Sequence, residues 1–230
     1  MIYTQGLPES MLAEKIAGWE NSLPKTIKLA YLPSPGRVKM RLSSVGKNRG
    51  ELQQNIDSQV EKLKKIIPQY IYSEENEDLG SLIGELLRKN NSTLSTAESC
   101  TGGYIAHLIT RVAGSSDYYK GSVISYANEI KTKELNVSEK DLEQLGAVSQ
   151  QVVEQMALGV QQKMNTDYSI ATSGVAGPTG GTEQKPVGTV WIAVATPNGV
   201  KSKKYLFGKQ RAVNIERAAI TALGMLRELV

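Results

Sequence analysis

One stretch of the sequence, residues 96–133, mixes short apolar runs with hydroxyl residues, a glycine pair, a tyrosine and lysines. Packing alone does not require this mixture. The pair Gly102-Gly103 lets backbone amides approach a ligand, and a helix after it offers the ligand its positive N-terminal end. Hydroxyl groups and a lysine can carry nucleophilic chemistry. This stretch therefore predicts a strand, a turn and a helix that together hold a reactive site.

Strands and helices alternate through the C-terminal part of the chain. Apolar runs bounded by turn residues predict strands, and apolar residues at helical spacing predict helices. The expected strands are residues 93–98, 121–126, 168–172, 189–196 and 201–207, and the expected helices are 103–111, 139–146, one capped by Ser149, and 210–229. The last two strands form a hairpin around Pro197-Asn198-Gly199. This order predicts a layered α/β domain with a mixed sheet.

The first 73 residues predict a separate, smaller α/β unit. A helix after Pro8, strands at residues 27–32 and 37–45, a helix with an apolar stripe from Leu52 to Leu63, and a short strand at 70–73 give the order α-β-β-α-β. The acidic run at residues 73–78 is the expected boundary. We therefore expect a KH-like α/β domain at residues 1–75 and a second domain at residues 76–230.

Composition limits the classes of function. Lys and Arg exceed Asp and Glu by 13 to 11 in residues 1–90 and by 14 to 12 in residues 91–230, so the basic excess is spread evenly. An even spread argues against a nucleic-acid partner but suits an anionic small molecule. The single cysteine fits a reducing cytoplasm, and the absence of a long apolar run argues against a membrane partner. One histidine and one cysteine argue against a zinc site, and we expect no metal or cofactor.

Several motifs occur in an order that resembles one protein family. They are Thr-Ala-Glu-Ser-Cys-Thr-Gly-Gly from residue 96, Ala-Gly-Ser-Ser from 113, Ser-Tyr-Ala-Asn-Glu-Ile-Lys from 125, and Thr-Ser-Gly-Val-Ala-Gly-Pro-Thr-Gly-Gly from 172. From about residue 79 onward the chain resembles the C-terminal domain of the CinA (competence/damage-inducible) family, a nicotinamide-nucleotide amidase module. The N-terminal unit resembles the KH-like middle segment of that family. Many CinA proteins carry a further N-terminal pyrophosphatase domain, so we expect this chain alone not to cleave ADP-ribose.

The resemblance implies a Ser-Lys mechanism. It places the nucleophile on Ser116, the base on Lys131 and a proton relay on Tyr126. A lysine accepts a proton only when it is neutral, so its pKa must fall from about 10.4 through burial or nearby positive charge. Spacing alone does not pair these residues, because the strand expected at residues 121–126 lies between them. The chain must fold back after Tyr126 for them to meet.

The same resemblance implies a substrate-binding set. Its members are Ser99, Thr101, Gly102, Gly103, Ser173, Gly174, Gly177 and Arg211. The glycine-rich residues 174–188 can turn backbone N–H groups toward an anion, and the Arg211 guanidinium can fork onto a phosphate. Ser99 is an alternative nucleophile because it lies at a strand-to-helix turn. A cysteine enzyme built on Cys100 and His107 is a weaker alternative.

The resemblance therefore implies a nicotinamide-nucleotide amidase. It would convert nicotinamide mononucleotide and water to nicotinate mononucleotide and ammonia, as a cytoplasmic homo-oligomer for which a dimer is favoured. The alternatives are a catalytically silent nucleotide-binding protein and a nucleic-acid-associated competence protein. A KH module that binds RNA uses a Gly-x-x-Gly loop, and the nearest candidate here, Gly46 to Gly50, has the wrong spacing. The N-terminal unit is therefore expected to serve packing or dimerisation.

Overall fold

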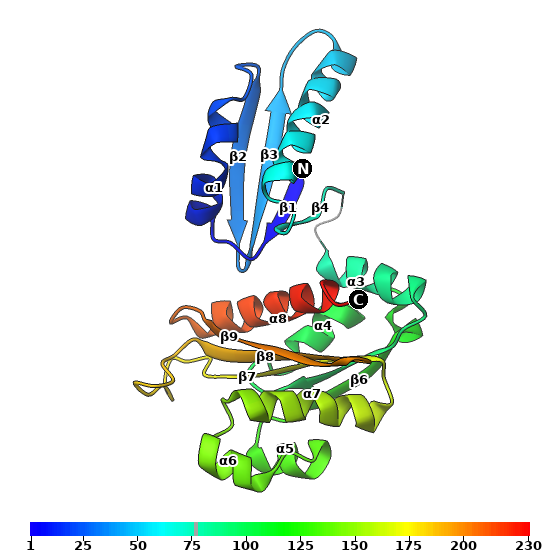
Figure 1. Cartoon of the computed structure of the whole chain (residues 1–230), viewed down its shortest axis with the longest axis vertical. Helices are drawn as coiled ribbons and strands as arrows, with labels where there is room; N and C mark the ends of the chain where they lie inside the picture. The colour runs from blue at the N-terminus through cyan, green and yellow to red at the C-terminus, as the bar shows by residue number, and fades with distance from the viewer. Residues whose placement is uncertain (76–77) are drawn as a thin grey trace. The chain divides into compact units, whose positions relative to one another are not determined.

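The computed structural model describes residues 1–75 and 78–230, and the chain divides into two compact units, Met1–Glu77 and Asp78–Val230 (Figure 1). Two residues of the acidic run expected at the boundary, Asn76 and Glu77, lie outside the described residues. The Asp78 side chain accepts a hydrogen bond from the N–H of Gly80 at 3.2 Å and so caps the next helix. None of the described helices is both long and apolar enough to span a bilayer.

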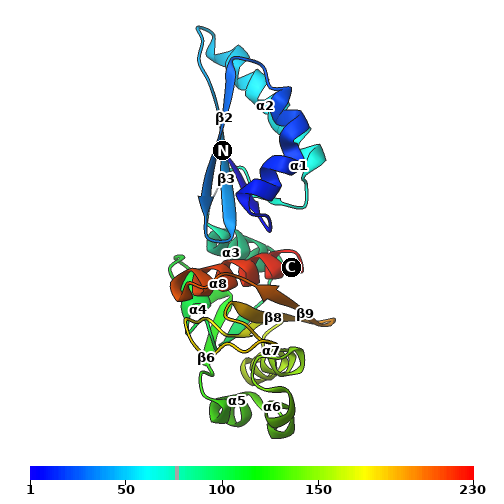
Figure 2. The same cartoon turned by 90° about the vertical axis from the view of Figure 1, so that its left-hand side faces the viewer.

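The first unit is a four-stranded antiparallel sheet with two helices. Its elements are β1 (Ile2–Gln5), α1 (Glu9–Asn21), β2 (Ile27–Ser34), β3 (Arg37–Ser44), α2 (Arg49–Ile66) and β4 (Ile71–Ser73), and the strand order is β2-β3-β1-β4. Both helices pack on one face of the sheet (Figure 2). The α-β-β-α-β order is confirmed, but the sequence prediction missed β1, whose four residues are too few to show an alternating pattern. β1 lies inside the sheet between β3 and β4.

The core of the first unit lies between the sheet and its helices. Leu12 and Ile16 of α1, Leu63 of α2, and Ile2 and Met40 of the sheet are all fully buried. The indole N–H of Trp19 donates to the Gln59 carbonyl at 3.1 Å, which ties α1 to α2. Val38 and Met40 alternate along β3 with polar neighbours, so this strand buries one face against the helices.

The second unit is a three-layer α/β structure around a five-stranded mixed sheet. Its elements are α3 (Leu79–Lys89), β5 (Leu94–Glu98), α4 (Tyr104–Thr110), β6 (Tyr119–Ile124), α5 (Asn128–Leu135), α6 (Glu139–Leu145), α7 (Gln150–Met164), β7 (Tyr168–Gly174), β8 (Thr189–Thr196), β9 (Gly199–Leu206) and α8 (Arg211–Arg227). The strand order is β6-β5-β7-β8-β9; the first three strands are parallel, and β8 and β9 are antiparallel to their neighbours. Helices α5, α6 and α7 cover one face, and α3, α4 and α8 cover the other (Figure 1). The predicted mixed sheet is confirmed.

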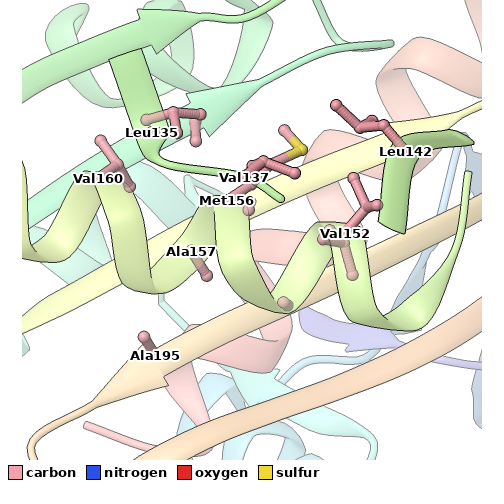
Figure 3. Close-up of a cluster of buried hydrophobic side chains, with 12 residues drawn as sticks. Leu135, Val137, Leu142, Val152, Met156, Ala157, Val160 and Ala195 are labelled. Carbon is pink, nitrogen blue, oxygen red and sulfur yellow. The ribbon is translucent and has the colours of Figure 1, made fainter. Parts of the chain in front are cut away.

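Helix α7 organises the core on its face of the sheet. Val152, Met156, Ala157 and Val160 point from α7 into a buried cluster that also contains Leu135 and Val137 from the end of α5 and the residues after it (Figure 3). Gly159 allows the two helices to approach closely, because a Cβ there would overlap the Leu135 carbonyl oxygen. This contact holds α5, the helix that carries Lys131, against α7.

One strand boundary and one predicted helix cap differ from the sequence prediction. Strand β6 ends at Ile124, so Ser125 and Tyr126 leave the sheet instead of continuing the strand. Ser149 precedes α7 as predicted, but its hydroxyl donates to the Gly146 carbonyl at 2.9 Å and does not cap the helix.

Candidate active site

The candidate site lies at the carboxyl ends of the parallel strands. Strands β5, β6 and β7 run in the same direction, so their carboxyl ends meet at one edge of the sheet. The chain leaves β5 toward α4 on one face and leaves β6 toward α5 and α7 on the other (Figure 1). In open α/β sheets, ligands bind where neighbouring strands send their connections to opposite faces. The carboxyl ends of β5 and β6 are therefore the expected position of the reactive groups.

Lys131 is a buried amine at this edge. It is 1% exposed, and its Nζ donates to the backbone oxygens of Ser125 at 2.7 Å and Tyr126 at 3.3 Å, just after β6. Burial lowers the pKa of Lys131 below its ordinary value, although the nearby Cys100 thiol acts in the opposite direction. A neutral amine has two N–H bonds, one for each of these carbonyls, and keeps a lone pair. The environment thus favours the form of lysine that can accept a proton.

Ser99 directly follows β5 at the same edge. The parallel register pairs Glu98 with Ile124, so Ser99 and Ser125 come next on neighbouring strands. Neighbouring strands lie about 4.8 Å apart. This register therefore places Ser99 next to Ser125, whose carbonyl binds Lys131. Ser99 is 9% exposed, and its N–H donates to the Thr172 carbonyl at 3.0 Å, which fixes the residue to the end of β7.

Ser116 lies at the opposite edge of the sheet from Lys131. It occupies the 3-10 turn Ser115–Asp117, which precedes β6, whereas Lys131 binds carbonyls that follow β6. The six residues of β6 separate the two ends by roughly 20 Å at about 3.3 Å per residue. The chain does fold back after Tyr126, but α5 places Lys131 at the carboxyl end of β6, whereas Ser116 precedes the amino end of this strand. The expected meeting of Ser116 with Lys131 does not occur within this chain.

A buried carboxylate shapes the turn that contains Ser99. Glu98 is fully buried, and its two oxygens accept four hydrogen bonds. The donors are the Thr101 hydroxyl at 2.7 Å and the backbone N–H groups of Gly103 at 3.0 Å, Ile105 at 3.0 Å and Ala106 at 2.8 Å. The last two N–H groups open α4. The chain therefore supplies its own anion at this helix N-terminus, which corrects the expectation that these amides face a ligand.

The rest of the turn is anchored to the neighbouring strand. The Thr101 hydroxyl also lies 2.8 Å from the Thr172 hydroxyl of β7, so the predicted binding residue Thr101 has a structural role in holding the turn. Gly102 is exposed, and Gly103 is half-buried. A role for these two glycines in binding substrate stays a prediction.

Cys100 and His107 do not have the environment of a thiolate–imidazole pair. Burial raises the pKa of the Cys100 thiol to about 12, which disfavours the reactive thiolate. His107 is exposed on α4, and its ring stacks on Tyr104 with 5.9 Å between centroids. The cysteine alternative therefore loses support.

Arg211 joins three parts of the site. Its guanidinium donates to the Tyr126 hydroxyl at 3.1 Å and to the Gly177 carbonyl at 2.9 Å. The first residue of α8 is thus connected to the end of β6 and to the glycine-rich residues 174–188. Gly177 has φ of +88°, and a Cβ there would overlap the side chain of Val187. Tyr126 is 63% exposed, and its predicted role as a proton relay stays a prediction.

Ser173 and Gly174 have structural partners. The Ser173 hydroxyl is buried and donates to the Ala147 carbonyl at 2.6 Å, and Gly174 pairs with Val190 in the sheet. Within residues 174–188, the N–H of Val175 donates to Thr189 and the N–H of Gly188 donates to Val175. These amide groups hold the loop together and are not turned toward an anion.

Two further residues that shape the site escaped the sequence prediction. Glu98 is one of them, and its signal is an acid that ends an apolar strand just before a glycine pair. Asn214 is the other; it is 1% exposed on α8, donates to the carbonyls of Ala176 at 3.0 Å and Gly208 at 2.8 Å, and accepts from the Gly208 N–H at 3.0 Å. The sequence pattern that could have identified Asn214 is an amide side chain at a position of the helix that is otherwise apolar. In residues 1–75 and 78–230, no group of three His, Cys, Asp or Glu side chains is arranged to hold a metal.

Comparison with known proteins identifies the family. The sequence model of the CinA C-terminal domain matches residues 76–230, and that of the damage-inducible protein CinA KH domain matches residues 1–73. The chain belongs to the CinA family. The resemblance inferred from the motifs is therefore confirmed.

Relatives within the CinA family cover nearly the whole chain. A CinA-like protein of Flavobacterium psychrophilum is 51% identical over 98% of this chain, and one of Cytophaga hutchinsonii is 47% identical over 99%. This chain spans about half the length of these curated relatives, 54% of each.

Solved CinA-family structures share the fold. The competence/damage inducible protein CihA of Agrobacterium tumefaciens matches with a TM-score of 0.64 and 36% identity, over 69% of this chain and 99% of that one. A competence-damaged protein (CinA) superfamily protein of Escherichia coli matches with a TM-score of 0.65 and 31% identity, over 69% of this chain and 95% of that one.

Proposed function

We propose that this chain is an amidohydrolase that converts nicotinamide mononucleotide and water to nicotinate mononucleotide and ammonia, with Ser99 as nucleophile and Lys131 as base. The substrate class comes from the resemblance to the amidase module of CinA proteins. The observation that carries the assignment of roles is the buried Lys131 amine, which two carbonyls hold at the carboxyl end of β6, and Ser99 follows the neighbouring strand β5 at the same end. The roles differ from those first expected, because Ser116 lies at the other edge of the sheet.

The chemistry follows from the protonation state of Lys131. A serine hydroxyl becomes a strong nucleophile only when a base removes its proton, and burial favours a neutral lysine that can do so. The Ser99 oxygen bonds to the carboxamide carbon while its proton passes to Lys131. The lysine then returns a proton to the amide nitrogen, the C–N bond breaks and ammonia leaves. Water hydrolyses the acyl-enzyme by the same route.

Arg211 is the proposed contact for the phosphate of the substrate. Its guanidinium is exposed and uses two of its donor groups on Tyr126 and Gly177. A guanidinium has five N–H bonds, so donors remain for a phosphate oxygen. The N-terminus of α4 does not serve this purpose, because Glu98 already occupies it. Selectivity for the mononucleotide over its riboside would follow from Arg211.

The test is ammonia release from nicotinamide mononucleotide, with free nicotinamide and glutamine as control substrates. Ser99→Ala should lose about 10²–10⁴ or more in kcat, because nucleophile and base act as one unit. Ser116→Ala is the matched control, since it removes the same group at the other edge and should keep near-normal turnover. The reverse result would return the nucleophile to Ser116. Absence of ammonia release by the wild-type chain, with the nucleotide still bound, would favour a catalytically silent nucleotide-binding protein.

A further inference from the structure

Tyr126 presents an exposed aromatic ring at the candidate site. Single exposed apolar side chains are common, but here two stand together: Tyr126 is 63% exposed and Ile124 is 51% exposed, with the fully buried Ser125 between them. Ile124 lies against the turn after β5, since a Cβ on Gly103 would come within 3.1 Å of the Ile124 Cδ1 atom. Ile124 therefore borders the turn that contains Ser99, and Tyr126 follows at the same end of β6.

Both ends of Tyr126 contact residues that have proposed roles. Its backbone oxygen accepts a hydrogen bond from the Lys131 Nζ at 3.3 Å, and its hydroxyl accepts one from the Arg211 guanidinium at 3.1 Å. A mononucleotide in this site places its carboxamide at Lys131, the proposed base, and its phosphate at Arg211. The aromatic ring of the substrate lies between these two groups, just as the Tyr126 ring lies between its backbone and its hydroxyl. The two rings therefore share the interval between Lys131 and Arg211.

The ring of nicotinamide mononucleotide has a chemistry that suits a tyrosine face. It is a planar pyridinium with a positive charge, because its nitrogen carries the ribose. The face of an aromatic side chain is negative, so it attracts a cation. The Tyr126 hydroxyl is used on Arg211, whereas the ring is exposed. The same contact restrains the ring before the substrate arrives, which lowers the entropy lost on binding.

We propose that Tyr126 determines specificity for the ring of the substrate, by placing its face against the positively charged pyridinium. This inference rests on the proposed function and adds a second element of selection to it. Arg211 selects the phosphate, and Tyr126 selects a cationic ring. A carboxamide on a neutral ring of the same shape lacks the attraction and binds more weakly.

The experiment compares the binding of two nucleotides to the full chain by calorimetry. One is nicotinamide mononucleotide, and the other is benzamide riboside 5′-monophosphate, which has the same shape but a neutral ring. All proteins carry Lys131→Met, so that the substrate is not consumed. This parent should favour the charged ring about 2- to 30-fold. Tyr126→Leu should reduce the ratio to about 1, whereas Tyr126→Phe should keep it, because the ring remains although the hydroxyl is lost.

The matched control is Tyr168→Leu, which makes the same exchange at a half-buried position at the amino end of β7. It should keep the preference of the parent. Equal affinity of the parent for both nucleotides would overturn the proposal, and so would an unchanged ratio in Tyr126→Leu. A ratio of about 1 in Tyr126→Phe would overturn it as well, because the hydroxyl and not the ring would then be responsible.

The binding ratio separates this inference from the proposed reaction. A wild-type chain that releases no ammonia would contradict the reaction, while the ratio would still decide the role of Tyr126. If the chain bound neither nucleotide, the proposed substrate class and the role of Tyr126 would both be refuted. Trp191 fluorescence checks that each variant keeps the second unit folded.

Discussion

Replacing Glu98 by glutamine tests whether a buried anion holds the turn beside the proposed nucleophile. Glutamine keeps the shape of the side chain but exchanges one oxygen for an amide nitrogen. The glutamine oxygen can keep the contacts with Thr101, Gly103 and Ile105. The glutamine nitrogen then faces the N–H of Ala106, and this hydrogen bond is lost because both groups are donors. The opposite orientation loses the two bonds from the N–H groups of Gly103 and Ile105, because only the Thr101 hydroxyl can accept from an amide nitrogen. The first orientation is therefore the less costly one.

The magnitude follows from these contacts. One lost hydrogen bond to a charged group costs about 1.5–3 kcal/mol. Removing the negative charge at the N-terminus of α4 costs about 0.3–2 kcal/mol more. The Glu98→Gln variant should therefore have a free energy of unfolding about 2–5 kcal/mol lower than the parent. The middle of this range corresponds to a fall in Tm of about 10 °C. The displaced turn should also lower kcat for ammonia release more than it changes KM, because Ser99 follows Glu98 directly.

The assay is thermal unfolding of the second unit followed by Trp191 fluorescence. Trp19 lies in the first unit, so all variants carry Trp19→Phe to isolate the Trp191 signal. Glu143→Gln is the control, since it makes the same chemical change at an exposed position of α6 and should stay within about 0.5 kcal/mol of the parent. Equal Tm values for the Glu98 and Glu143 variants would refute the idea that the Glu98 carboxylate anchors the turn.

Three further outcomes are expected. Lys131→Met should abolish ammonia release without lowering the free energy of unfolding at pH 7, because burial makes a charged Lys131 amine unfavourable in the folded chain. A large loss of stability in a urea titration would contradict this. The wild type should gain stability as pH rises from the lowered pKa of Lys131 to the ordinary value, because the unfolded chain binds more protons there, and this gain should be absent from the Lys131→Met variant. Arg211→Gln should raise KM for nicotinamide mononucleotide but not for its riboside, and equal changes for both would remove the phosphate assignment.

Sequence patterns predicted the elements of the fold well where several residues repeat. The apolar residues of α7 recur at helical spacing, and those of β3 alternate with polar ones. Both patterns predict their elements from the sequence alone, because each repeats over many residues. The four residues of β1 are too few to show an alternating pattern. The central position of β1 depends on pairing with β3 and β4, which no local pattern encodes.

The sequence offers candidate residues for the site but not their arrangement. Ser99 and Lys131 were recognised as reactive types, but their proximity depends on the register between β5 and β6. Glu98 was overlooked because its four donors follow it in a turn whose shape the carboxylate itself creates.

The most direct test of the central claim is the pH dependence of kcat/KM for ammonia release from nicotinamide mononucleotide. The measurement runs from about pH 6.5 to about pH 9.5, above the second phosphate ionisation near 6. If neutral Lys131 accepts the Ser99 proton, kcat/KM should rise with pH and level off below the ordinary lysine pKa of about 10.4, because burial lowers this pKa. If the charged form of Lys131 is needed, kcat/KM should instead fall as pH rises through the same range, which would contradict the proposed mechanism.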